Sequence, residues 1–215
     1  MKTNFVAICL FAIILTAKCE SSEESSEYSE QLKALKSHKM YSEAKKYCNF
    51  DEETLLNETI KLGECITGLN WNMTVCSLYQ SQIPDCIEPY LKTFESCVKG
   101  TGADLPRFIK DIFVASTKYI CTVSGESVME IFNFCTFEDS KYDDEITQKF
   151  ISSFEKFKEG EELPSKSHVC TFFTETKTLF VDAIHDTCYN PVTRKFHEGL
   201  IDAIISTCDG ENEIK

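Results

Sequence analysis

The cysteines constrain the fold of this chain more than any other feature. Two of the twelve, Cys9 and Cys19, lie close to the N-terminus. An even number of widely spaced cysteines is typical of a protein cross-linked by disulfides in an oxidising compartment. The sequence therefore predicts five bridges among the other ten, which are Cys48, Cys65, Cys76, Cys86, Cys97, Cys121, Cys135, Cys170, Cys188 and Cys208.

Two other uses of cysteine do not fit this spacing. Structural zinc sites use cysteine pairs separated by about two to four residues, whereas the closest pair here, Cys76 and Cys86, is ten positions apart. The sequence also lacks the C-x-x-C pair of thiol redox enzymes. We therefore expect structural disulfides, with no metal site and no cofactor.

The N-terminal residues predict a secreted, extracellular protein. Lys2 precedes an apolar run over residues 5–15, and small residues follow, so residues 1–19 read as a signal peptide cleaved after Cys19. The run is shorter than the roughly 20 residues that a membrane helix needs, and no later segment supplies such a run, so we expect no membrane span. Residues 20–30 form an acidic leader that we expect to be flexible. Residues 31–210 then form a single helical, disulfide-rich domain.

The net charge argues against one class of partner, and two short motifs predict sites of modification. The formal net charge of -13 repels phosphate backbones, so we expect no nucleic-acid partner. Asn57-Glu58-Thr59 and Asn72-Met73-Thr74 match the pattern for N-glycosylation, which predicts Asn57 and Asn72 as modification sites in a secreted chain.

Apolar residues recur at helical intervals, and Gly, Pro and Asn separate the segments that carry them. Strand-like alternation is nearly absent, so the pattern predicts an all-α fold, a disulfide-linked array of antiparallel amphipathic helices. Asn190-Pro191 is expected to join the last two helices as a cap and a first helical residue. The expected helices cover 29–47, 51–68, a short piece after Asn72, then 84–100, 104–124, 124–137, 143–158, 165–189 and 191–208.

Helix geometry limits the disulfide pairing. Cys86 and Cys97 share one predicted helix and are separated by about 16 Å along its axis, beyond the roughly 7 Å limit between bridged Cα atoms. Cys170 and Cys188 are excluded from pairing with each other on the same ground. Antiparallel hairpins favour Cys170 with Cys208 and Cys86 with Cys121, and a short turn favours Cys65 with Cys76. The pairing of the other four cysteines stays open.

Catalytic motifs give little support for an enzyme. His185-Asp186 on a predicted helix resembles the His-Asp pair of secreted phospholipase A2, but Val181 and Asp182 stand where that family has cysteines, and no glycine-rich calcium loop is present. The simpler interpretation is a surface histidine near a helix end. The remaining histidines are isolated, and the sequence contains neither H-E-x-x-H nor G-x-S-x-G. Acidic runs such as 143–145 lack EF-hand spacing and suit helix starts. We therefore expect a non-enzymatic protein.

The residues around the cysteines carry a family resemblance. The segments that carry it are Lys46-Tyr47-Cys48, residues 63–69, residues 86–91, Tyr119-Ile120-Cys121 and Cys188-Tyr189-Asn190-Pro191. In their order and flanking residues they resemble the 27 kDa haemolymph glycoprotein family of insects. The resemblance implies secretion into body fluid and N-glycosylation, and it implies no established activity.

Two functions remain open from the sequence. One is a carrier that holds a small apolar ligand among Phe-rich helices such as 108–123 and 150–157, because apolar pockets are lined in this way. The other is an interaction or effector protein that presents a helical surface to a receptor or another extracellular protein. A large exposed apolar patch without a cavity would favour the second function.

Overall fold

The computed structural model describes residues 52–98, 100–157 and 163–209, and within these ranges the regular structure is entirely helical. The prediction of an all-α, disulfide-linked fold is confirmed. The signal peptide, the acidic leader and the helix expected over 29–47 lie outside the described residues. The helices are α4 (Glu52–Thr67), α5 (Val75–Ser77), α6 (Ile83–Cys97), α7 (Leu105–Ile120), α8 (Gly125–Met129), α9 (Asp143–Phe154), α10 (Lys166–Thr187) and α11 (Pro191–Ser206).

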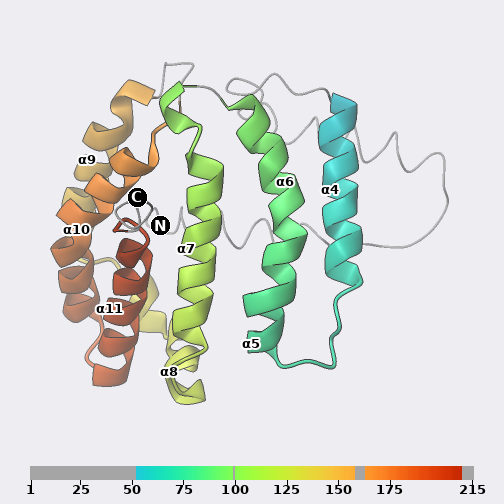
Figure 1. Cartoon of the computed structure of the whole chain (residues 1–215). Helices are drawn as coiled ribbons and strands as arrows, with labels where there is room; N and C mark the ends of the chain where they lie inside the picture. Colours follow the sequence, from blue (N-terminus) through green and yellow to red (C-terminus); the bar gives the residue numbers. More distant parts are fainter. Residues whose placement is uncertain (1–51, 99, 158–162, 210–215) are drawn as a thin grey trace.

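Helix α7 lies in the middle of the molecule. Helices α6 and α4 lie on one side of it, and α9, α10 and α11 form a group on the other side (Figure 1). Helix α7 contacts both α6 and α11, so it is shared by the two halves. Its buried residues Phe108, Ile112 and Phe113 come from the apolar stripe that the sequence predicts.

One core fills the space between α4, α6 and α7. It is built from buried Leu69, Leu78, Ile83, Cys86 and Phe113, and partly buried residues such as Ile66 pack around it. Each buried aliphatic or aromatic side chain of this kind contributes about 1.5 to 3 kcal/mol of hydrophobic stabilisation.

A second core joins α7 to the last three helices. Phe108 and Phe196 are each 1 % exposed. Phe172 of α10 contacts the rings of Phe150 and Phe154 of α9, with centroids 5.6 and 5.4 Å apart. Such edge-on pairs add stability beyond the area that they bury. The Phe residues of α9 therefore pack against those of α10.

The turn between α10 and α11 forms as the sequence predicts. The side chain of Asn190 accepts a hydrogen bond from the N–H of Val192 at 2.9 Å, and Pro191 is the first helical residue. Proline fits this position because the N–H that it lacks would have no partner inside the helix.

Residues 75–97 form one helical rod, and the predicted break before Pro84 is wrong. Helix α5 continues through a π-helical turn, η1 (Leu78–Gln82), directly into α6. The N–H of Ile83 donates to the carbonyl of Leu78, five residues back. This wider turn precedes Pro84, so the proline enters the helix without ending it.

The rod changes two of the three expected disulfides. Cys170–Cys208 is confirmed, with Cα atoms 5.6 Å apart. The pairings Cys65–Cys76 and Cys86–Cys121 are wrong. The observed bridges are Cys65–Cys86, Cys76–Cys121 and, among the cysteines left open, Cys135–Cys188.

The reason is the length of the rod. Ten helical residues separate Cys76 from Cys86, which is about 15 Å along the axis. Cys76 at the start of the rod therefore reaches Cys121 just beyond the end of α7, and Cys86 lies beside Cys65 of α4. The two excluded pairs, Cys86–Cys97 and Cys170–Cys188, do not form. Cys48 and the side chain of Cys97 lie outside the described part of the structure.

The single helix expected over 124–137 is also wrong. Helix α8 ends at Met129, and two short 3-10 turns follow, η3 (Glu130–Phe132) and η4 (Phe134–Phe137). Between them Asn133 is extended, with φ -66° and ψ 126°. Its side chain accepts from the N–H of Cys135, so Asn133 ends one turn and caps the next.

Candidate functional site

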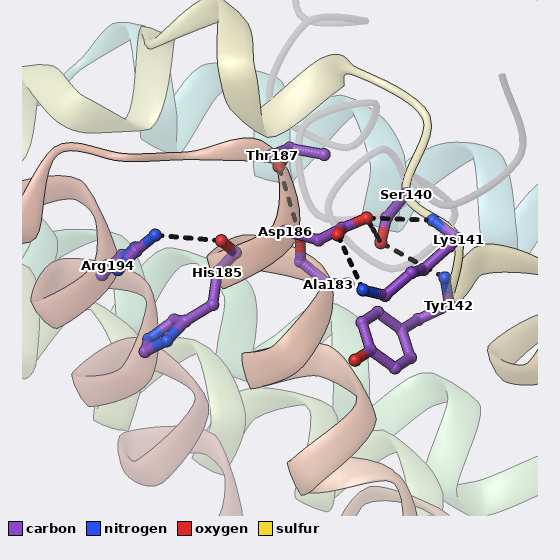
Figure 2. A network of polar contacts seen from close by, with 8 residues as sticks. All are labelled: Ser140, Lys141, Tyr142, Ala183, His185, Asp186, Thr187 and Arg194. Atoms are coloured by element: carbon purple, nitrogen blue, oxygen red, sulfur yellow. Dashed lines mark hydrogen bonds and ion pairs between the residues drawn. The ribbon is translucent and has the colours of Figure 1, made fainter.

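The structure places His185 and Asp186 in separate contacts. Asp186 accepts hydrogen bonds from the Ser140 hydroxyl and from the backbone N–H of Lys141, both at 3.2 Å, and the Lys141 ammonium lies 3.1 Å away. Figure 2 shows the His185 ring pointing away from this group, and its Nε2 contacts Glu198. The two side chains therefore face different partners, Asp186 the loop before α9 and His185 the residue Glu198 of α11.

Asp186 connects the end of α10 to the loop before α9. The N–H of Lys141 and its ammonium, together with the Ser140 hydroxyl, lower the pKa of the Asp186 carboxyl, and the pKa of Lys141 is raised in turn. Arg194 donates to the carbonyl of Cys188 and to that of His185 (Figure 2), and the two bonds close the turn into α11. This network has a structural role.

The most unusual surface feature lies over the two 3-10 turns. Five large apolar or aromatic side chains are exposed there: Met129 (64 %), Phe132 (61 %), Phe134 (86 %), Phe137 (58 %) and Tyr189 (84 %). We call these five residues the aromatic surface. Tyr189 is included because the bridge between its neighbour Cys188 and Cys135, with Cα atoms 5.1 Å apart, brings its backbone close to the segment that carries the other four. Exposed aromatic residues grouped in this way mark interaction sites.

Polar contacts fix the backbone beneath the aromatic surface. Glu130 accepts hydrogen bonds from the hydroxyl of Thr193 and from the side-chain amide of Asn133. Asn133 also donates to Thr193, whose side chain is fully buried on α11. These donors lower the pKa of the Glu130 carboxyl. The segment 129–137 is therefore attached to α11 at its middle.

The same segment is attached to α10 at its end. The Cys135–Cys188 bridge makes one connection, and the hydrogen bonds from Ser140 and Lys141 to Asp186 make another. These attachments fix the backbone that carries the aromatic side chains before a partner arrives. Binding to such a surface loses less conformational entropy than binding to a loose loop.

The segment that carries four of the five residues of the aromatic surface has charges of one sign. Between Lys118 and Lys141 the chain contains no Lys or Arg. The charged residues of that interval are Glu126, Glu130, Glu138 and Asp139. Glu126, Glu138 and Asp139 are exposed, so this segment has an acidic rim, whereas beside Tyr189 the cation Arg194 donates to the carbonyl of Cys188.

Two grooves of the described residues are lined mainly by polar side chains. The first, of about 280 Å³, lies between α6 and α7, and in it Lys110 donates to Glu88, which lowers the pKa of that carboxyl. The second, of about 360 Å³, lies beside the Cys170–Cys208 bridge and is lined mainly by polar residues of α10. The charged lining of the first groove is Glu88, Lys92, Glu95, Arg107, Lys110 and Asp111.

The described residues contain neither a metal-binding cluster nor a helix suited to a membrane. Residues 52–98, 100–157 and 163–209 contain no group of three His, Cys, Asp or Glu side chains suited to a metal ion. In the same ranges no helix combines the length and the apolar character needed to cross a bilayer.

The two predicted glycosylation sites lie in different settings. Asn57 lies within α4, where its side chain is exposed. Asn72 lies in the loop between α4 and α5 and is also exposed. Both side chains are accessible to solvent, and both sites stay predictions.

Comparison with protein-family models, with curated proteins and with solved structures finds no significant match to this chain. The resemblance to insect haemolymph glycoproteins therefore stays a prediction. The class of the protein is defined by its architecture alone, which is an all-α fold cross-linked by disulfides.

Sequence reasoning missed the aromatic surface because it assigned residues 124–137 to one amphipathic helix. A signal was present. Phe132, Phe134 and Phe137 cannot share one face of a regular helix, since 3.6 residues complete each turn. Asn133 among them is a residue type that favours caps and turns.

Proposed function

We propose that this protein is a secreted, non-enzymatic extracellular protein that binds another extracellular protein through the aromatic surface. The observation that carries the proposal is the group of five exposed side chains, Met129, Phe132, Phe134, Phe137 and Tyr189. Aromatic residues and Met are enriched where proteins meet.

The arrangement of the Phe residues favours this role over the carrier role. In α9 and α10 the rings of Phe150, Phe154 and Phe172 contact one another. In α7, Phe108 and Phe113 are buried in the two cores. The grooves described above are lined mainly by polar and charged residues, unlike the sites that hold apolar ligands. A carrier function stays a prediction from the sequence.

The acidic rim indicates the chemistry of the partner. Glu126, Glu138 and Asp139 repel an acidic protein or an anionic lipid headgroup, and they attract Lys and Arg. The partner that fits best has an apolar centre flanked by basic side chains. Attraction of this kind speeds association and weakens as salt rises.

Secretion supports the same role. The disulfides suit an oxidising compartment, and the N-terminal residues read as a signal peptide. Each bridge also limits the unfolded ensemble, which suits a protein exposed to proteases outside the cell.

Photo-crosslinking tests the proposal. A benzoylphenylalanine residue replaces Phe134 in the full secreted protein, which is then illuminated in extracellular fluid from its own source. We expect one main protein adduct, with a partner of basic isoelectric point. The yield should fall several-fold between about 50 and 500 mM salt, because the screening length shortens over this range.

The control places the same photoreactive residue at Phe150, which is 41 % exposed but lies outside the aromatic surface. Phe132→Ala and Phe137→Ala should each lower the adduct yield from position 134. A yield equal to that of the Phe150 control, an acidic partner or a lipid adduct would contradict the proposal.

A further inference from the structure

The loop between α4 and α5 has a fixed backbone. The side chain of Gln82 accepts from the N–H of Asn70 at 3.1 Å and donates to the sulfur of Met73 at 2.8 Å. Asn70 in turn accepts from the N–H groups of Asn72 and Met73. The hydroxyl of Thr74 caps α5 by accepting from Ser77. These contacts give Asn72 a defined position with its side chain in solvent.

Three exposed apolar residues lie within three positions of this asparagine in the sequence. Trp71 is 65 % exposed, Val75 is 68 % exposed and Met73 is 36 % exposed. Single exposed apolar residues are common. Here, however, Met73 lies within the glycosylation sequon, Val75 follows it, and Trp71, the only Trp of the chain, directly precedes it.

We propose that Asn72 carries an N-linked oligosaccharide whose first sugar packs on the indole ring of Trp71. The donor class is an oligosaccharide linked through pyrophosphate to a lipid. The amide nitrogen of Asn72 attacks the anomeric carbon, the new C–N bond replaces the C–O bond to pyrophosphate, and the amide loses one proton as the lipid pyrophosphate leaves.

Sugar chemistry explains why a glycan suits this loop. One face of a pyranose ring consists of C–H groups, which carry slight positive charge, and the face of an aromatic ring is negative. The sugar is attached one residue from Trp71, so its effective concentration beside the indole is high. The packing removes apolar surface from water while the rest of the glycan stays hydrated.

The second sequon provides a matched comparison. Asn57 lies within α4, where its neighbour Glu58 is engaged with Lys61 at 2.7 Å. Trp71 lies outside this helix, in the loop that follows it. A glycan at Asn57 is therefore expected to leave the fluorescence of Trp71 unchanged.

Fluorescence of the single Trp tests the proposal directly. The full chain is secreted from eukaryotic cells as the natural sequence, as Asn72→Gln and as Asn57→Gln. Mass spectrometry measures the occupancy of each site, and acrylamide quenching measures the accessibility of Trp71. We expect occupancy at Asn72, with quenching about two-fold stronger in Asn72→Gln because one indole face becomes open. Asn57→Gln should match the natural sequence.

Enzymatic trimming tests the packing without mutagenesis. An endoglycosidase that leaves only the first N-acetylglucosamine should keep Trp71 protected. An amidase that removes the whole glycan, and converts Asn72 to aspartate as it does so, should expose it. An unmodified Asn72 in the secreted protein would overturn the proposal. So would an occupied Asn72 whose removal leaves the quenching constant unchanged.

Discussion

Gly199 shows how one residue fixes the distance between two helices. It lies on α11 opposite Tyr119 of α7, whose hydroxyl donates to the carbonyl of Phe196 at 3.1 Å. A Cβ atom added at Gly199 would overlap the Tyr119 ring. Because Gly199 has no side chain, α11 can lie close to α7. Helix α7 contacts α6 on its other side, so this close packing joins the two halves of the molecule.

Gly199→Ala is expected to destabilise the protein although alanine favours helices by about 1 kcal/mol over glycine. The overlap with Tyr119 should outweigh that gain. Gly63→Ala in α4 is the matched control, because a Cβ there meets nothing within 4 Å, and it should stabilise by about 1 kcal/mol. Urea denaturation measures both. Equal gains in the two variants would show that α7 and α11 do not pack closely at this point.

His197 makes stability depend on pH. Its Nδ1 lies 2.9 Å from the carbonyl of Thr193, and burial lowers its pKa, although the charge of Glu130 acts in the opposite direction. The unfolded chain, with a His pKa of about 6.5, therefore binds more protons than the folded protein just below that pH. The free energy of unfolding should fall as pH decreases through this window.

Replacing His197 by Gln should remove this dependence between about pH 6.5 and the lower pKa of the folded state. Urea denaturation of both proteins at a series of pH values measures it. The lowered pKa of Asp186 acts in a separate and more acidic window, where protonation of the carboxyl loses its stabilising contacts. A parallel pH dependence in His197→Gln would assign the effect to other groups.

At the scale of elements, the disulfides connect helices that the chain order keeps apart. Cys76–Cys121 joins the start of the rod to the residue after α7, and Cys135–Cys188 joins the η4 turn to the end of α10. The second of these also brings Tyr189 to the other members of the aromatic surface. The Cys76–Cys121 bridge therefore stabilises the fold, whereas the Cys135–Cys188 bridge stabilises the fold and also holds Tyr189 near the rest of the candidate site.

Comparing two bridges that close loops of similar length distinguishes a role in stability from a role in the aromatic surface. Cys135–Cys188 spans 53 residues and Cys170–Cys208 spans 38, so replacing either pair by Ala should cost about 4 kcal/mol of stability by loop entropy. Only the loss of Cys135–Cys188 should also lower the crosslinking yield at position 134. Equal yields in the two double variants would show that the bridge does not organise the aromatic surface.

At the scale of the whole molecule, α7 belongs to both cores. Phe113 packs with the residues of α4 and α6, and Phe108 is buried with its ring centroid 5.6 Å from the Lys166 ammonium at the start of α10. Neither half has a complete core without α7. We therefore expect the described helices to unfold as one cooperative unit.

Phe196→Ala tests this cooperativity. The substitution removes a ring that is 1 % exposed and should cost about 3 to 5 kcal/mol. Trp71 lies in the opposite half, beside α4 and α5, so its fluorescence reports on the distant part of the molecule. The midpoints measured by Trp71 fluorescence and by circular dichroism should shift together. Separate midpoints would show that the two halves unfold independently.

The helices could be predicted because their signals are local. The stripe containing Phe108 and Ile112 gave α7, and Asn190-Pro191 gave the start of α11. The rod over 75–97 could not be predicted in the same way. Proline usually interrupts a helix, yet the rod passes through a π turn before Pro84 and continues past Pro89 inside α6.

The number and spacing of the cysteines, the helical periodicity and the acidic charge are properties of the chain itself, so the sequence alone determined an all-α, disulfide-linked class of protein. The tertiary structure decided which cysteines pair, because pairing depends on how far each helix extends beside its neighbour. It also decided that Phe132, Phe134 and Phe137 face solvent. The hydrogen bond of Asn133 to Glu130 is local, but Asn133 reaches Thr193 only after α11 has packed against the 3-10 turns.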